Sequence, residues 1–386
     1  MSAIGKMVKL DKRPWITRMS DPIRTRDPKR HLWVHRDEIR LPPYVSRIVA
    51  IAESGYGKTT LLGNLARSAL EAEKRVVVLD GKGIRQDIPM WIGLGREYES
   101  RVRVVPEQGW KLWTGRPVDA KLAEAMIPES SEPVFKESAR GLLHALVADG
   151  AYWSTSGELL DRLARPRSYL TNPHAILAAK ARLAGQAAHL GVHRSVSDAL
   201  QLVAPYEDPV GFNFDTDFDL AVLSLPVSSD AGAQRMGVAV LAAFSAWVTE
   251  SADTRPTMVI VDEAGSFLDS PAVPPAKDLL EKVRSSGHSI VLASQSFDSL
   301  GRQARQIIHS GADLIVGRTS DPDELLQAFG TVEHEEETAS SGLGAGAGSY
   351  RVQHTFAIQP TEIRDLPPGV FIIKSGSTYA CVRPYA

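Results

Sequence analysis

The sequence predicts an α/β protein with a mainly parallel central sheet flanked by helices. Short runs rich in β-branched residues alternate along the chain with segments of helical periodicity. These runs are apolar throughout, which is typical of strands buried on both faces of a parallel sheet. Seven such runs are present, at 47–52, 75–80, 101–105, 220–225, 258–262, 289–293 and 313–317.

The composition agrees with this fold class. The chain has 386 residues, of which 43% are hydrophobic and 23% charged, so it can bury a sizeable core. No apolar run reaches the roughly 20 residues of a membrane-spanning helix. The single cysteine, Cys381, excludes an intrachain disulfide, and the N-terminus has no apolar signal segment. These features favour a cytoplasmic location.

Residues 1–40 are predicted to form a basic N-terminal arm. Residues 1–30 hold nine Lys or Arg against three Asp, whereas the whole chain has a net charge of -2. Such an arm can contact phosphates, dock on a neighbouring subunit or remain solvated. A run of charge does not by itself choose among these.

The segment between the third and fourth apolar runs differs from the rest. Residues 133–204 are rich in Ala, Leu and Arg at helical spacing, which predicts an inserted all-α subdomain. Residues 41–132 and 205–386 would then form one α/β domain. Near the C-terminus, 333–350 runs from an acidic cluster into a Gly-rich stretch and is predicted to be a mobile connection. Two later runs, 370–374 and 379–383, predict a hairpin.

The stretch AESGYGKTT, residues 52–60, carries the first chemical signal. An apolar run precedes it and a helical pattern follows, the context in which backbone N–H groups and a helix N-terminus hold phosphate. Lys58 would reach the β and γ phosphates of ATP, and Thr59 would supply a hydroxyl ligand to Mg²⁺. Ala52 stands where the usual motif begins with Gly. Tyr56 is bulky for such a loop, and its ring either stacks near the nucleotide or faces solvent. The predicted nucleotide-binding residues are Ser54, Gly55, Tyr56, Gly57, Lys58, Thr59 and Thr60.

Polar residues also end two later strands. Asp262 and Glu263 follow the run 258–262, so that Asp262 can orient Mg²⁺ while Glu263 polarises an attacking water. The alternative for Asp262 is an ordinary helix cap. Gln295 follows the run 289–293 and is a candidate sensor of the γ phosphate or the lytic water. The pattern therefore predicts hydrolysis as well as binding.

Arg284 lies near the end of a helical pattern, eleven residues before Gln295. An arginine there can act as a finger on the nucleotide of a neighbouring subunit. It can equally interact with the dipole at the end of its own helix. The spacing does not distinguish these two roles.

Taken in order, these segments resemble the FtsK–HerA superfamily of ring-forming ATPases, and within it the coupling proteins of conjugation and type IV secretion. The resemblance runs from about Leu41 to Arg383. It rests on the phosphate loop, on RVVVLDGKGI with Asp80, Lys82 and Gly83, and on FKESARGLLHALV, which is similar to the start of the family's helical insertion. It also rests on VDEAGSF, on Arg284-x-x-Gly287, on LASQSFDSL, and on the segments IIHSGADLIVGRTSDPDELLQAFG and EIRDLPPGVFIIKSGSTYACVRPY.

The resemblance implies a RecA-like P-loop NTPase fold with ATP and Mg²⁺ as cofactors. It also implies a homo-hexameric ring in which nucleotide sites lie between subunits and DNA passes through a central channel. The implied roles are phosphate and Mg²⁺ binding for Lys58 and Thr59, hydrolysis for Asp262 and Glu263, sensing for Gln295 and action in trans for Arg284. Candidate channel-lining residues are Lys82, Arg85 and 266–277.

The resemblance favours an ATP-driven motor that translocates DNA in conjugative transfer. We expect no membrane span in this chain, so a relaxase or secretion-channel partner would recruit it to the inner face of the membrane. Three alternatives remain: a secretion ATPase that moves protein, a DNA-packaging motor, and an assembly or scaffold protein whose oligomeric state depends on ATP.

Overall fold

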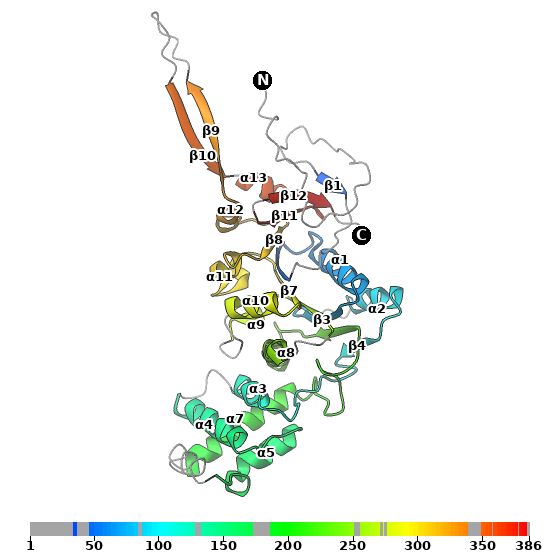
Figure 1. Ribbon diagram of the computed structural model, residues 1–386, viewed down its shortest axis with the longest axis vertical. Coiled ribbons are helices and arrows are strands. Elements are labelled where there is room, and N and C mark those ends of the chain that lie inside the picture. The colour runs from blue at the N-terminus through cyan, green and yellow to red at the C-terminus, as the bar shows by residue number, and fades with distance from the viewer. Residues whose placement is uncertain are drawn as a thin grey trace, which may run out of the picture.

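The computed structural model describes residues 34–36, 46–83, 87–127, 133–172, 186–250, 255–270, 273, 276–338, 349–356, 358–376 and 378–383. Most of the predicted basic arm, residues 1–40, lies outside this part of the chain. So do Arg85 and parts of 266–277, which the sequence suggested as channel-lining residues. Figure 1 shows an elongated molecule with a sheet at its centre, a group of helices at one end and a projecting hairpin at the other.

Ten strands of the described chain form a sheet at the centre of the molecule, in the order β1-β12-β11-β8-β2-β7-β6-β3-β5-β4. The run from β8 to β4 is parallel throughout, while β11 is antiparallel to both β8 and β12. All seven predicted strands are present, and the predicted fold class is confirmed. The strands are β1 Val34–Arg36, β2 Arg47–Ile51, β3 Arg75–Asp80, β4 Val102–Val105, β5 Leu220–Ser224, β6 Thr257–Asp262, β7 Ser289–Ser294, β8 Asp313–Val316, β11 Phe371–Ser375 and β12 Thr378–Arg383.

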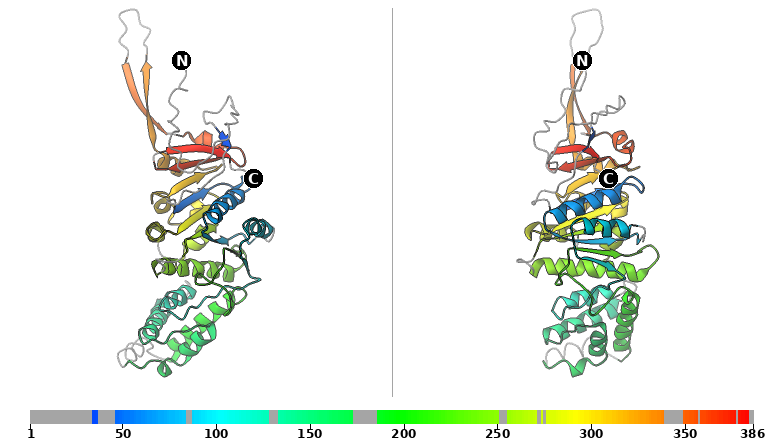
Figure 2. Two further views of the ribbon diagram at one scale, coloured as in Figure 1. Left: turned by 45° about the vertical axis from the view of Figure 1, so that its right-hand side comes forward. Right: turned by 90° about the vertical axis from the view of Figure 1, so that its right-hand side faces the viewer.

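Helices cover both faces of this sheet (Figures 1 and 2). Alternate residues of each strand point to opposite faces, so Ile48 packs with α1 and α2 while Val49 packs with the helices of the other face. The first face carries α1 Lys58–Glu71 and α2 Ile88–Glu97. The other face carries α8 Ala231–Glu250, α9 Gly265–Leu268, α10 Ala276–Ser285, α11 Ala304–Ile308 and α12 Asp323–Phe329; α13 Pro360–Arg364 precedes β11.

A separate group of helices lies at the lower end of Figure 1. It contains α3 Asp119–Met126, α4 Pro133–Ala148, α5 Ser156–Ala164, the 3-10 turn η3 Pro166–Ser168 and α7 Gln186–Val203. Within the predicted insertion, 133–204, the described residues form helices and turns and contain no strand. Because α3 also packs against α4, α7 and α8, we keep the limits of this subdomain as a prediction.

The prediction of a mobile connection at 333–350 is wrong for both ends of that segment. β9 Thr331–Thr338 and β10 Ser349–Phe356 form an antiparallel ribbon that projects from the molecule in Figure 1. The prediction rested on the composition of the acidic cluster alone. Its partner strand, β10, is rich in β-forming residues. Residues 339–348, the Gly-rich part, lie outside the described chain. The predicted C-terminal hairpin is confirmed by the antiparallel pair β11 and β12.

None of the helices in the described ranges is both long enough and apolar enough to cross a bilayer.

Candidate active site

Residues from three distant segments meet at the carboxyl edge of the sheet. β7 lies between β2 and β6, and all three are parallel, so their C-terminal ends share one edge. Lys58 begins α1, directly after the loop that follows β2. β6 ends at Asp262 and is followed by Glu263, and Gln295 follows β7. In open α/β sheets, this edge is where ligands bind.

A compact ion-pair cluster joins these residues. Lys58 Nζ lies 2.8 Å from Asp262 Oδ1 and 3.4 Å from Glu263 Oε1. Gln295 Nε2 donates a hydrogen bond of 2.8 Å to the same Glu263 oxygen. Lys58 is 3% exposed and Asp262 5%, so each charge depends on its partner. A ligand that supplied a negative charge to Lys58 and a positive charge to Asp262 could replace these partners.

The loop before α1 has the backbone shape of an anion site. Gly55 and Gly57 have φ values of 81° and 90°, in the left-handed region that favours glycine. A Cβ at Gly57 would lie 3.2 Å from the Cα of Gly369. Helix α1 starts at Lys58 with no side-chain cap and no acidic residue in its first turn. Its first N–H groups are therefore positioned for a phosphate.

The rest of the predicted loop lies around this helix start. Thr59 is half-buried in the first turn of α1, while Ser54, Gly55 and Thr60 are exposed. Thr59 follows Lys58 in α1, at the same edge as Asp262, and its role as a metal ligand stays a prediction. Ala52 is buried, and its Cβ would lie 2.8 Å from a Cβ on Gly317 at the end of β8. The missing side chain at Gly317 explains how the loop accommodates alanine.

Tyr56 has a specific partner. The Arg318 guanidinium lies 4.7 Å from the centre of the Tyr56 ring and donates to its hydroxyl group. Arg318 Nε also lies 3.5 Å from Glu53 Oε2, and the Gly369 N–H donates to the Tyr56 carbonyl at 3.0 Å. The ring thus stacks on an arginine, an arrangement that sequence reasoning missed. The sequence signal for this contact is Arg318 itself, a basic residue shortly after β8, which is the strand next to β2.

Two further residues of the site come from the end of β3: Asp80 is its last residue, and Lys82 follows it. Lys82 Nζ lies 3.3 Å from Asp262 Oδ2 and 3.9 Å from Glu263 Oε1. The Lys82 side chain thus lies within the site, and its suggested place in a channel stays a prediction. Asp80 is buried, and one of its oxygens accepts from the Lys82 N–H at 3.1 Å. The sequence contains the motif Asp-x-Lys-Gly, but it does not indicate that β3 lies beside β6.

Burial and the neighbouring Asp262 charge raise the pKa of Asp80 to about 6. Its second oxygen, Oδ2, has no hydrogen-bond partner among the described residues. Buried oxygens of this kind usually bond to a partner. The site therefore contains one carboxyl group whose bonding capacity is not used within the described chain.

The backbone at Glu263 is strained. Its φ of 57° is unusual for a residue with a long side chain. The Glu263 N–H donates to Asp262 Oδ1 at 3.1 Å, and the next residue, Ala264, donates to Ala293 of β7 at 2.9 Å. These bonds hold the strained turn, which directs the Glu263 side chain toward Lys58 and Gln295. Strain of this type is often found at functional sites.

Arg284 does not join the cluster within this chain. It is exposed in the last turn of α10, which leads into the amino end of β7. Burial lowers the pKa of Arg47, the first residue of β2, and the nearby positive charge of Arg284 lowers it further. Arg284 thus lies at the opposite edge of the sheet from Lys58. Its role toward a second subunit remains a prediction.

The residues of the site fit a magnesium–nucleotide complex. Within the described ranges, no three His, Cys, Asp or Glu side chains are grouped to hold a metal alone. Mg²⁺ commonly binds one or two protein groups and takes its other ligands from phosphate and water. Asp262 and Thr59 are such groups, and the uncapped start of α1 beside them suits the phosphates.

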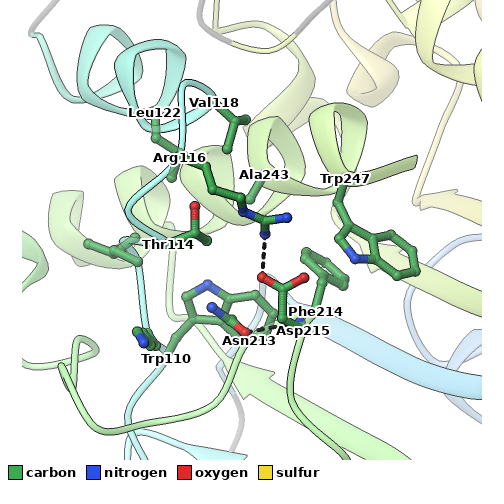
Figure 3. Close-up of a pocket in the computed structure, with 12 residues that line it drawn as sticks. Trp110, Thr114, Arg116, Val118, Leu122, Asn213, Phe214, Asp215, Ala243 and Trp247 are labelled. Carbon is green, nitrogen blue, oxygen red and sulfur yellow. Dashed lines mark hydrogen bonds and ion pairs between the residues drawn. The ribbon is translucent and has the colours of Figure 1, made fainter. Parts of the chain in front are cut away.

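A cavity lies away from this cluster, between the helical group and the sheet (Figure 3). Trp110, Phe214 and Trp247 line it, and Arg116 donates to Asp215 across it. The Asp215 N–H donates to Asn213 at 3.0 Å, so polar groups here bond to one another. It contains none of the predicted site residues. We interpret it as a packing junction between the two parts.

Comparisons with known proteins support the fold. No family model and no curated protein matches the sequence. The plasmid coupling protein TrwB in complex with ADP and Mg²⁺ is similar in structure, with a TM-score of 0.60, 18% identity and coverage of 96% of this chain and 94% of that chain. TrwB with the non-hydrolysable ATP analogue ADPNP has a TM-score of 0.56 and 19% identity, with coverage of 89% of this chain and 86% of that chain. VirB4 of Thermoanaerobacter pseudethanolicus has a TM-score of 0.55 and 13% identity, with coverage of 92% of this chain and 94% of that chain. At these identities the likeness shows a shared fold, the RecA-like P-loop fold that the sequence predicted.

Proposed function

We propose that this protein is an ATP-hydrolysing motor of the conjugation and type IV secretion class, and that it moves DNA as a ring of six identical subunits. The observation that carries this proposal is the cluster of Lys58, Asp262, Glu263 and Gln295 at one edge of a RecA-like sheet. A phosphate-binding lysine, a metal-orienting carboxylate and a carboxylate for the attacking water are the parts that phosphoryl transfer uses.

Each residue has a defined task in this scheme. Lys58 leaves Asp262 to bind the β and γ phosphates, while Thr59 and Asp262 hold the metal. When bound there, Mg²⁺ would supply positive charge against the phosphates. Glu263 accepts a proton from the water whose oxygen attacks the γ phosphorus, and the bond from that phosphorus to ADP breaks. Gln295, already bonded to Glu263 at 2.8 Å, holds that carboxylate in position and senses the γ phosphate.

The structural neighbours support this assignment in a general way. TrwB is a conjugative coupling protein with structures that contain ADP and Mg²⁺ or non-hydrolysable analogues of ATP and GTP. VirB4 has the same fold. By analogy, ATP and Mg²⁺ are the proposed cofactors here. DNA, a relaxase and a secretion-channel protein are the proposed partners, and the proposed location is the cytoplasm at the inner face of the membrane.

The first experiment measures ATP turnover of the purified protein with and without DNA at low salt. DNA should bind and stimulate turnover. The Lys58→Ala variant should lose nucleotide binding. Arg284→Ala should still bind nucleotide and lose turnover by roughly 10³-fold, since a missing arginine finger has an effect of this size. Normal hydrolysis by Arg284→Ala would remove its assignment as the finger.

The second experiment separates the proposed motor from its alternatives. Mass measurement with and without ATP and DNA should detect a hexamer that assembles on DNA. Turnover that is indifferent to DNA, together with no DNA binding, would rule out both a DNA translocase and a packaging motor. Capture of a secreted protein without nucleic acid would favour a protein-moving ATPase. Full biological activity of Glu263→Gln would favour a scaffold.

A further inference from the structure

Two lysines share one carboxylate in the candidate active site. Lys58 binds Asp262 Oδ1 at 2.8 Å, and Lys82 binds Asp262 Oδ2 at 3.3 Å. The Lys58 side chain is 2% exposed and that of Lys82 17%, so neither ammonium group is simply solvated. Glu263 Oε1 is the next acceptor for both, at 3.4 Å from Lys58 and 3.9 Å from Lys82. The cluster thus holds one more cation than phosphate binding by Lys58 requires.

The backbone around Lys82 is tightly packed. A Cβ at Gly81 would lie 2.8 Å from the Asp262 carbonyl oxygen, and one at Gly83 would lie 2.5 Å from the Pro226 nitrogen. Gly83 also has a φ of 59°. The Lys82 N–H is bonded to Asp80 at 3.1 Å. The backbone therefore has little freedom, and a change at this position must come from the side chain of Lys82.

We propose that Lys82 is a second phosphate-binding lysine, which Asp262 holds in the nucleotide-free protein and releases to the terminal phosphate when Asp262 takes up the metal. This inference rests on the proposed function and adds to it a residue that distinguishes ATP from ADP. Lys82 reaches the cluster from β3, on the other side of β6 from Gln295. The terminal phosphate would then be bound by one lysine at the start of α1 and by another that follows β3.

Electrostatics drives this exchange. Asp262 loses its attraction for the two ammonium groups once its charge is committed to a divalent cation, because like charges a few ångströms apart repel strongly inside a protein. Lys58 then passes to the β and γ phosphates. For Lys82, the described anions within reach are Glu263 and Asp80, and the γ phosphate adds a stronger one. ADP lacks that phosphate, so only ATP satisfies Lys82.

The test compares equilibrium affinities and needs no turnover. Binding of ADP and of a non-hydrolysable ATP analogue, both with Mg²⁺, is measured for wild type, Lys82→Met and Lys82→Arg. In Lys82→Met the preference for the ATP analogue over ADP should fall about tenfold, the usual size of a hydrogen bond to a charged group. Lys82→Arg keeps the charge and should retain most of the preference. Lys121→Met, at an exposed lysine of α3, should behave as wild type.

Each outcome bears on the proposal. An unchanged ratio of the two affinities in Lys82→Met, whether or not both affinities fall together, would show that Lys82 is a structural ion-pair partner and would overturn it. If Lys82→Met does not fold, Lys82→Gln gives the same readout. Failure of the wild type to bind either nucleotide overturns the proposed function itself. A changed ratio with no DNA stimulation would instead support Lys82 and contradict only the DNA motor.

Discussion

The central sheet buries charged groups at both of its edges, with different partners at each. At the carboxyl edge, the Lys58 ammonium pairs with the Asp262 carboxylate at 2.8 Å. At the amino edge, Arg75 donates to the Phe214 carbonyl at 2.8 Å and to the Thr257 hydroxyl at 3.1 Å. A charge paired with an opposite charge can exchange that partner for a charged ligand. A charge held by neutral groups, as that of Arg75 is, has no charged partner to exchange for a ligand. Its role is to stabilise the fold.

Aromatic rings complete the amino edge. The Arg75 guanidinium lies 5.2 Å from the Phe218 ring centre and 5.1 Å from that of Trp247. The neighbouring Lys74 ammonium donates to the Ser289 hydroxyl at 3.1 Å. Burial lowers the pKa of Lys74 and of Arg75. The same parallel strands thus carry the candidate active site at one end and a structural cluster at the other.

The largest expected effect is at the carboxyl edge. Glu263→Gln should lower ATP turnover by about 10³-fold, within the range for a lost general base, because an amide cannot accept the proton of water. Nucleotide affinity and the free energy of unfolding should change little. Steady-state turnover, nucleotide titration and chemical denaturation measure the three quantities. Glu281→Gln, an exposed carboxylate on α10, is the matched control. A turnover equal to wild type would contradict the role of Glu263.

The amino edge should respond in the opposite way. Arg75→Met should lower the free energy of unfolding by about 3 kcal/mol, because the Phe214 and Thr216 carbonyl groups and the Thr257 hydroxyl group lose a buried charged donor. The folded variant should bind nucleotide as wild type does. Arg194→Met, at a side chain that is 85% exposed, should change stability by less than about 0.5 kcal/mol. If Arg75→Met bound nucleotide poorly without losing stability, the comparison of the two edges would be wrong.

The amino edge also predicts a pH dependence. Burial, followed by the charges of Arg75 and Lys74, lowers the pKa of His288 to about 4, and His288 Nδ1 accepts from the Thr257 N–H at 3.1 Å. Between pH 6.5 and 4 the unfolded state binds the proton that the folded state excludes. This contribution to stability is therefore complete above pH 6.5 and is lost as the pH falls. It amounts to on the order of 3 kcal/mol.

Denaturant unfolding between pH 7 and pH 4.5 measures this contribution. His288→Asn should lose less stability than wild type over that range. Asp80, at the other edge, contributes with the opposite sign, since its pKa is raised to about 6 and the folded state then holds the extra proton. The difference between wild type and His288→Asn cancels the Asp80 contribution. A difference that did not vary with pH would show that His288 is not the group responsible.

The smallest expected effect belongs to the Tyr56 and Arg318 stack. The Arg318 side chain is 43% exposed, so its contact with the ring should contribute only about 0.5–1 kcal/mol. Arg318→Ala should lower stability by that amount, as measured by chemical denaturation. Tyr56→Phe removes the hydroxyl but keeps the ring, and should lose less. A loss of several kcal/mol in Arg318→Ala would place this half-buried pair with the structural cluster instead.

Local patterns predicted much of the fold and part of the site. Apolar runs located the strands because a parallel sheet buries both faces, and the loop around Lys58 was legible because its chemistry is contiguous in sequence. Lys82 and Arg318 were not assigned to the site, because their roles depend on β3 lying beside β6 and β8 beside β2. Strand order of this kind is set by packing across the whole sheet. The ribbon of β9 and β10 was missed for a similar reason, since each strand is defined by its partner.

The contact between Ala52 and Gly317 links two positions that are 265 residues apart in sequence. Their β carbons would lie 2.8 Å apart if both residues had one, and a Cβ on Gly317 would also crowd the Phe371 ring at 3.0 Å. Only one of the two positions can therefore carry a methyl group. Related sequences should show this as covariation: where alanine opens the phosphate loop, glycine should follow the strand corresponding to β8. A larger residue there should occur only with glycine in the loop and a smaller side chain at the position of Phe371.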